Sequence, residues 1–240
     1  MTGINFMKVS IFLVLAIILV LFFTPASRYL KTLYLIIITS PYERIVENAP
    51  EILVLGDSTG YGTGVGDSID SIAGLIGADY PDYTIKNNSV NGRTIGGLVP
   101  VAKETEGEFE LILLQIGGND ILQARPVSEV ESELRQIIES LADNTENLVM
   151  MSSGNVGGAS AFSRNEAVKY TALTREFRQM FIEVASSTDL IYVDLFLEPE
   201  DDIMSNNPEK YLAVDGLHPS AEGYSLWYKK LQPVVANILK

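Results

Sequence analysis

From about residue 50 to the end of the chain, short apolar runs alternate with longer stretches in which apolar residues recur at helical spacing. Apolar runs of strand length predict strands that are covered on both faces, and the helical spacing predicts amphipathic helices. The predicted strands span residues 51–56, 83–87, 111–117, 147–152 and 190–195. The predicted helices span residues 68–78, 94–104, 129–142, 165–186 and 221–239.

This alternation predicts an α/β fold in which a parallel sheet carries helices on both faces. Residues 50–240 have the size of one domain, and they contain no internal repeat or low-complexity tract. In open parallel sheets, ligands bind just outside the carboxyl ends of the strands. The segments that directly follow the predicted strands are therefore the expected location of functional residues.

Residues 9–23, VSIFLVLAIILVLFF, are apolar except for Ser10. As a helix they would extend roughly 22 Å, against a membrane hydrocarbon core of about 30 Å. An uncleaved anchor is favoured over a cleaved signal peptide, and a buried core helix fits poorly because the run is apolar on every face. We expect residues 1–49 to form an N-terminal hydrophobic helix, as anchor or signal segment, and a juxtamembrane stretch. The protein is then membrane-anchored or secreted, with residues 50–240 outside the cytoplasm.

The formal net charge is −14, and the chain contains no cysteine. A surface this acidic repels phosphate backbones, which excludes nucleic acid as a partner. The lack of cysteine excludes disulfide frameworks, cysteine zinc sites and cysteine nucleophiles. Any nucleophile must therefore be another type of residue.

The loop after the first predicted strand, GDSTGYGTGVGDS at residues 56–68, is rich in glycine and has Ser58 at the strand end. It could display a nucleophilic serine or cradle a phosphate. The dinucleotide fingerprint G-x-G-x-x-G does not fit, and the chain has no Gly-Lys pair for a Walker motif. A flexible loop in which Asp57 or Ser58 caps the next helix remains an alternative.

Two further strand ends offer hydrogen-bond donors. Gly92, in NNSVNGRTIGG at residues 87–97, could present a backbone N–H in a tight loop. Asn119, in GGND at residues 117–120, has a neutral amide that can donate to an oxyanion. A plain turn remains the alternative at both places.

The segment DGLHP at residues 215–219 contains His218, the only histidine in the chain. Asp215 precedes it by three residues and could accept a hydrogen bond from the imidazole, which would fix its tautomer. An inert surface turn is the alternative. Together, a serine, an oriented base and two donors at strand ends are the constellation for acyl transfer. The G-x-S-x-G motif of α/β-hydrolases is absent.

The four segments GDS, the Gly92 loop, GGND and DGLHP, in this order, resemble the sequence blocks of SGNH (GDSL-type) hydrolases over residues 50–240. The resemblance implies a flavodoxin-like, three-layer α/β/α sandwich with a five-stranded parallel sheet. It also implies hydrolysis of carboxylic esters or thioesters without a metal or organic cofactor. Ser58, His218 and Asp215 match the catalytic triad, and the N–H groups of Ser58 and Gly92 with the Asn119 side chain match the oxyanion hole.

The blocks do not specify the substrate, which we expect to be a lipid, an acetylated glycan or a small ester. Tyr61, Phe162 and Trp227 are candidate pocket residues, although the helical surroundings of Trp227 favour a place in the core. Two other functions remain open. One is a non-catalytic module that binds glycans or lipid head groups, and the other is nucleotide binding through residues 56–68.

Overall fold

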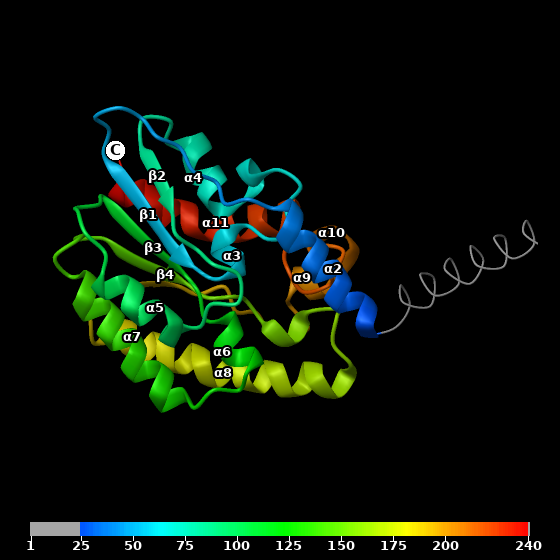
Figure 1. Ribbon diagram of the computed structural model, residues 1–240. Coiled ribbons are helices and arrows are strands. Elements are labelled where there is room, and N and C mark those ends of the chain that lie inside the picture. Colours follow the sequence, from blue (N-terminus) through cyan, green and yellow to red (C-terminus); the bar gives the residue numbers. More distant parts are fainter. Residues whose placement is uncertain (1–24, 240) are drawn as a thin grey trace, which may run out of the picture.

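The computed structural model describes residues 25–239. They form a five-stranded parallel sheet with the strand order β2-β1-β3-β4-β5 and helices on both faces (Figure 1). The strands are β1 (Glu51–Gly56), β2 (Thr84–Asn87), β3 (Leu111–Gln115), β4 (Leu148–Met151) and β5 (Ile191–Val193). All five predicted strands are present, and the α/β fold is confirmed. The predicted hydrophobic segment at residues 9–23 lies outside the described residues.

The two central strands explain why the apolar runs are continuous. In β1 the side chains of Ile52 to Leu55 are buried, and all five residues of β3 are buried. The two strands pair in parallel register, with Ile52 beside Leu111 and Leu55 beside Leu114. Because both faces of these strands are covered, no polar alternation is needed.

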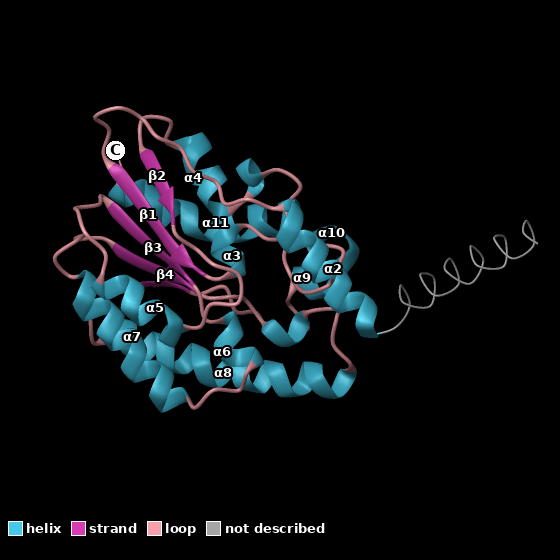
Figure 2. Cartoon of the chain, viewed as in Figure 1, coloured by secondary structure: helices cyan, strands magenta, loops and turns pink. Residues whose placement is uncertain are grey.

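Helices cover the sheet in two layers (Figure 2). One face packs against α5 (Ile95–Lys103), α7 (Val127–Leu141) and α8 (Arg164–Ser186), whose apolar side chains share one core cluster with the strands. The other face packs against α4 (Ile72–Asp79) and α11 (Ala221–Ile238) around a second cluster. Three layers are therefore present, as the family resemblance implies.

The predicted helix at 68–78 is divided in the structure. A 3-10 helix, Ser68–Asp70, ends at Ser71, whose hydroxyl accepts from the Gly74 N–H and begins α4. Several short helices lie in segments that the sequence pattern left as loops. They are α3 (Ser58–Tyr61), α6 (Gly118–Leu122), α9 (Ile203–Asn206), α10 (Pro208–Tyr211) and a 3-10 helix, Val156–Gly158.

A helix also precedes the sheet. α2 (Pro25–Ile38) lies near the carboxyl ends of the strands (Figure 1). The chain then continues to Arg44, which pairs with Ile85 at the edge of β2 and donates to the carbonyls of Gly77, Tyr80 and Tyr83. Among the helices of residues 25–239, none is both long enough and apolar enough to cross a membrane.

Candidate active site

The turn after β1 presents Ser58 to the cavity at the carboxyl end of the sheet. Asp57 is extended and caps α3, because its carboxylate accepts from the Thr59 N–H and hydroxyl, each at 2.8 Å. Ser58 is thus the first residue of α3, and its N–H has no acceptor within the helix. The alternative in which Asp57 caps the next helix is thus present in the structure, and it is compatible with a displayed serine.

The loop that carries the histidine lies directly against the serine loop. Gly64 makes this approach possible, since it has φ of +114° and a Cβ there would lie 2.2 Å from the Pro219 carbonyl oxygen. The histidine loop is closed by a hydrogen bond from the Ala213 N–H to the His218 carbonyl and by a bridge between Leu212 and Pro219. The turn therefore holds the imidazole in a fixed position over Ser58.

Three side chains form a continuous hydrogen-bonded row. The His218 Nε2 lies 2.8 Å from the Ser58 Oγ, although the two residues are 160 positions apart in the chain. The His218 Nδ1 lies 2.7 Å from the Asp215 Oδ2. His218 and Asp215 are only 6% and 4% exposed, whereas Ser58 is partly accessible from the cavity.

The Asp215 carboxylate is saturated with donors. Its Oδ1 accepts from the N–H groups of Leu217 and His218, at 3.0 and 3.1 Å. Its Oδ2 accepts from the imidazole and also from the Thr32 hydroxyl of α2, at 2.9 Å. Burial opposes ionisation, but the hydrogen bond and charge of His218 and the backbone donors outweigh it and hold the pKa of Asp215 below its usual value. The carboxylate is therefore kept charged beside the ring.

The two predicted donors line the same cavity as Ser58. Gly92 has φ of +82° and is exposed on the cavity wall. The Asn119 side chain comes from α6, and one of its amide hydrogens is donated to the Arg93 carbonyl at 3.1 Å. An amide has two such hydrogens, so the second can be donated to a bound group. The structure thus brings all five residues predicted from the sequence to one place.

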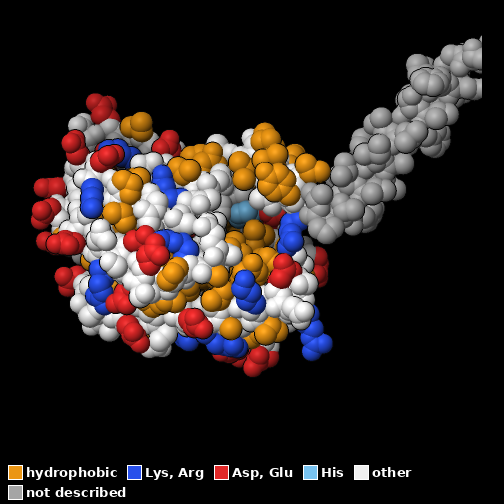
Figure 3. Space-filling view, turned by 60° about the horizontal axis from the view of Figure 1, so that its bottom comes forward, with side chains coloured by type: hydrophobic (Ala, Val, Ile, Leu, Met, Phe, Trp, Pro, Cys, Tyr) orange, Lys and Arg blue, Asp and Glu red, His pale blue; other side chains and the backbone are white. Residues whose placement is uncertain are grey.

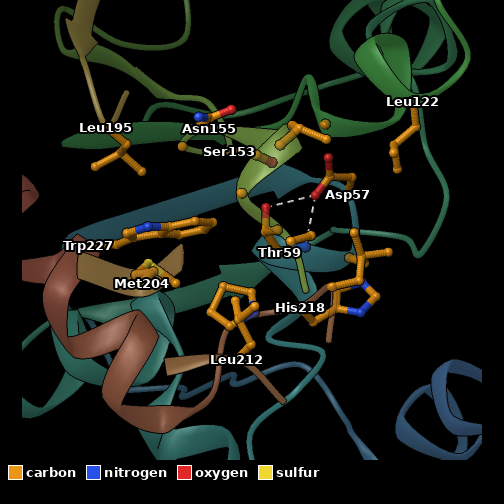
Figure 4. Close-up of a pocket in the computed structure, with 18 of the residues that line it drawn as sticks. Asp57, Thr59, Leu122, Ser153, Asn155, Leu195, Met204, Leu212, His218 and Trp227 are labelled. Atoms are coloured by element: carbon orange, nitrogen blue, oxygen red, sulfur yellow. Dashed lines mark hydrogen bonds between the residues drawn. The ribbon is translucent and has the colours of Figure 1, made fainter. Parts of the chain in front are cut away.

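The cavity has a volume of about 340 Å³ and is mostly apolar. In the view of Figure 4, Trp227, Leu195 and Met204 lie at one end, and His218 and Leu122 lie at the other. Trp227 also belongs to a core cluster, so it fills both of the roles considered for it, whereas Tyr61 and Phe162 do not line this cavity. The other apolar residues of the wall are Ile36, Val156, Ala159, Leu197, Ile203, Leu212, Leu217, Pro219 and Leu226.

Comparison with known proteins agrees with this geometry. A sequence profile of the GDSL-like lipase/acylhydrolase family matches residues 54–226. The chain belongs to this family. An arylesterase from Vibrio mimicus is 28% identical over 177 residues, which are 72% of this chain and 81% of that protein. The resemblance of the four sequence blocks to those of GDSL-type hydrolases is thereby confirmed. The comparisons support hydrolysis of carboxylic esters as the class of reaction.

Solved structures share the fold of this GDSL-family chain. A member of the lipolytic protein G-D-S-L family from Veillonella parvula superposes with a TM-score of 0.61 at 19% identity, covering 78% of this chain and 98% of that one. A catalytic mutant of an acetylxylan esterase from Geobacillus stearothermophilus gives 0.58 at 19% identity, covering 78% and 94%. The three-layer architecture is therefore that of GDSL-family proteins.

Two other buried acids, Asp57 and Asp120, do not belong to the hydrogen-bonded row of Ser58, His218 and Asp215. Burial raises the pKa of Asp57 to about 6, against the hydrogen bonds from Thr59 and the charge of His218, while Asp120 raises it further. Burial also raises the pKa of Asp120, although the Ile95 N–H and Arg125 hold its carboxylate at 3.0 and 2.9 Å. Asp120 thus ties α5 and Arg125 to α6, the helix that carries Asn119.

Sequence reasoning missed several residues of the site in this GDSL chain. Ser153 and Asn155 line the cavity and directly follow β4, so the strand-end rule could have identified them. Thr32 and Ile36 also line it, but they lie in the stretch expected to be juxtamembrane. No motif marks Thr32, and its contact with Asp215 spans 183 positions.

Proposed function

We propose that the protein hydrolyses carboxylic esters by covalent catalysis, with Ser58 as the nucleophile, His218 as the general base and Asp215 as the group that orients the imidazole. The observation that carries this proposal is the hydrogen-bonded row from Ser58 through His218 to Asp215, at 2.8 and 2.7 Å. A nucleophile within reach of a base that is itself held by a carboxylate is the arrangement that acyl transfer requires.

The reaction then runs in two halves. His218 Nε2 takes the hydroxyl proton as the Ser58 Oγ attacks the ester carbonyl carbon. The oxyanion accepts hydrogen bonds from the N–H groups of Ser58 and Gly92 and from the Asn119 amide. The imidazolium, stabilised by the Asp215 carboxylate, gives its proton to the leaving alkoxide, and an acyl-serine remains. His218 next deprotonates a water that attacks the acyl carbon, and the acid departs as the Ser58 Oγ recovers its proton. No metal or organic cofactor takes part.

The walls of the cavity favour an apolar substrate. Most of the accessible surface that lines it is apolar, and Trp227, Leu195 and Met204 lie at the end away from His218 (Figure 4). A pocket of this kind gains free energy by burying apolar surface, whereas the hydroxyl groups of a glycan would lose their hydration there. A lipid ester or a small apolar ester is therefore preferred over an acetylated glycan. The similarity to an arylesterase supports this choice.

The test is labelling with a fluorophosphonate probe, followed by a panel of p-nitrophenyl esters from acetyl to palmitoyl. Wild type should be labelled and should hydrolyse these esters, and Ser58→Ala should do neither. Ser128→Ala, which removes an exposed serine on α7, is the matched control and should behave as wild type. An unlabelled wild-type protein would favour a binding module instead.

We infer that the domain functions outside the cytoplasm, either anchored to a membrane or secreted. The support is the apolar run at residues 9–23 of the sequence, which has the composition of an anchor or signal segment. Fractionation of cells that produce the full chain, with protease added from outside, tests this. Degradation of the domain in intact cells is expected, and full protection would contradict the inference.

A further inference from the structure

α2 has two distinct faces. The inward face holds Leu35, which is buried, with Thr32 and Ile36 beside the cavity. The outward face is apolar and exposed, and we call it the outer face of α2. It consists of Tyr29, Leu30, Leu33, Tyr34, Ile37 and Ile38.

The outer face is unusual for a surface in contact with water. Ile37 is 74% exposed and Tyr29 is 71% exposed. At 100° per residue, all six side chains lie within one half of the helix circumference. Large contiguous apolar patches are rarely exposed on soluble monomers. Where they occur, they mark surfaces that bind a membrane or a partner protein. Packing within residues 27–239 leaves these six side chains between 40% and 74% exposed.

The outer face adjoins the mouth of the cavity. Ile36, which precedes Ile37 in the helix, lines the cavity. Two other residues of the lining, Leu197 and Ile203, have 38% and 46% of their surface exposed. Figure 3 shows hydrophobic side chains gathered around the hollow that contains the histidine, with most acidic side chains at the other end of this view. The exposed apolar surface is thus continuous with the entrance to the site.

The sequence around α2 indicates what covers the outer face. The chain immediately before α2 is the apolar run at residues 9–23. α2 itself contains no acidic residue, and its charged residues, Arg28 and Lys31, are both basic. Tyrosine and basic side chains are enriched at the boundary between lipid and water. Tyr29 and Tyr34 are such residues on the outer face.

We propose that the outer face of α2 lies in the interface of a lipid bilayer and holds the mouth of the cavity against the lipid. An ester within the bilayer then reaches Ser58 without crossing bulk water. This consequence rests on the proposed ester hydrolysis, whereas the placement of the helix does not. Since the whole chain has a net charge of −14, apolar burial rather than attraction to anionic lipid drives the contact.

The lack of cysteine permits a direct test. Ile37→Cys in the full chain carries a single environment-sensitive fluorophore, and the protein is reconstituted in phosphatidylcholine vesicles that contain a spin-labelled lipid quencher. Val168→Cys, on α8 and 67% exposed, is the matched control. The label at position 37 should be strongly quenched and the label at position 168 should not. Equal quenching at the two positions overturns the proposal.

Two other occupants of the outer face give different results. If residues 9–23 folded back on α2, the label at position 37 would already report an apolar environment before lipid was added. If a second copy covered the face, labels at position 37 would transfer energy to each other in vesicles at a low ratio of protein to lipid. Either result overturns the proposal.

A second readout separates the lipid contact from catalysis. Ile37→Glu should slow hydrolysis of an ester embedded in phosphatidylcholine vesicles by about tenfold or more, because a charge then replaces an apolar side chain that the lipid buries. Hydrolysis of soluble p-nitrophenyl acetate should stay within about twofold of wild type, since Ile37 does not line the cavity. An unchanged rate on vesicles overturns the proposal. If no ester is hydrolysed by wild type, the proposed function fails, and the quenching result still decides the placement of α2.

Discussion

The Thr32 hydroxyl donates to the Asp215 carboxylate at 2.9 Å, so a helix outside the family-matched residues 54–226 contacts the acid that holds the imidazole. Thr32→Val keeps the shape of the side chain and removes the donor. One hydrogen bond to a charged group is worth about 1.5–3 kcal/mol, so we expect kcat on a soluble ester to fall by about 10- to 100-fold. Thr32→Ser restores the donor and should recover most of the rate. Wild-type kcat in Thr32→Val would show that Thr32 does not position Asp215.

The Asn119 amide is expected to act mainly on the transition state. Asn119→Ala should lower kcat by roughly 100- to 1000-fold with little change in KM, by analogy with the loss of single oxyanion donors elsewhere. Asn119→Gln, with the same amide on a longer side chain, tests whether position matters as well as chemistry. Steady-state kinetics on p-nitrophenyl esters measure both constants. A large rise in KM at unchanged kcat would instead assign Asn119 to ground-state binding.

Asp57 should make stability depend on pH. Burial raises its pKa from 3.8 to about 6, so between these values the folded state holds a proton that the unfolded state has lost. The free energy of unfolding therefore falls as pH rises from about 4 to 6, by up to about 3 kcal/mol from this group. Asp57→Asn keeps the cap on α3 and should remove this contribution to the pH dependence of the free energy of unfolding.

Urea unfolding of wild type and Asp57→Asn at pH 4, 5, 6 and 7 measures the difference. The free energy of unfolding of Asp57→Asn, relative to that of wild type, should rise from pH 4 to pH 6 and then stay constant. An advantage that is the same at every pH would mean that Asp57 ionises normally in the folded protein.

The apolar end of the cavity should set the length of the acyl chain. Met204 lines this end together with Trp227 and Leu195 (Figure 4). Met204→Trp fills part of the volume, so kcat/KM for a decanoyl ester should fall by about tenfold while that for an acetyl ester changes little. Met204→Leu is the matched control of similar size. Equal losses for both esters would place the acyl group elsewhere.

The sequence pattern predicted the sheet well because its central strands are buried on both faces. Residues 51–56 match β1 fully. At the edge, the predicted strand at 190–195 shortens to Ile191–Val193, because β5 pairs only with β4 and carries a half-exposed Tyr192. Apolar composition marks where a strand is covered, but pairing decides where it ends.

The candidate site was predictable where its residues lie at strand ends and belong to recognisable sequence blocks, as for Ser58 and Asn119. The contribution of α2 was not, since no motif distinguishes Thr32 from the other polar residues of that helix, and its partner is known only from the folded chain. The walls of the cavity come from α2, α6, α9, α11 and the loops that follow β4 and β5. Scattered apolar positions of this kind carry no local signal that distinguishes a pocket from a core.

The separation of 160 positions between Ser58 and His218 also has a consequence during synthesis. At about 5–20 residues per second, the ribosome adds the histidine roughly 8–30 s after the serine. Throughout that interval the nascent chain carries the Ser58 hydroxyl without the imidazole that we propose as its proton acceptor. Under the proposed mechanism, the nascent chain therefore stays inert until the histidine loop has been synthesised and has folded against the serine.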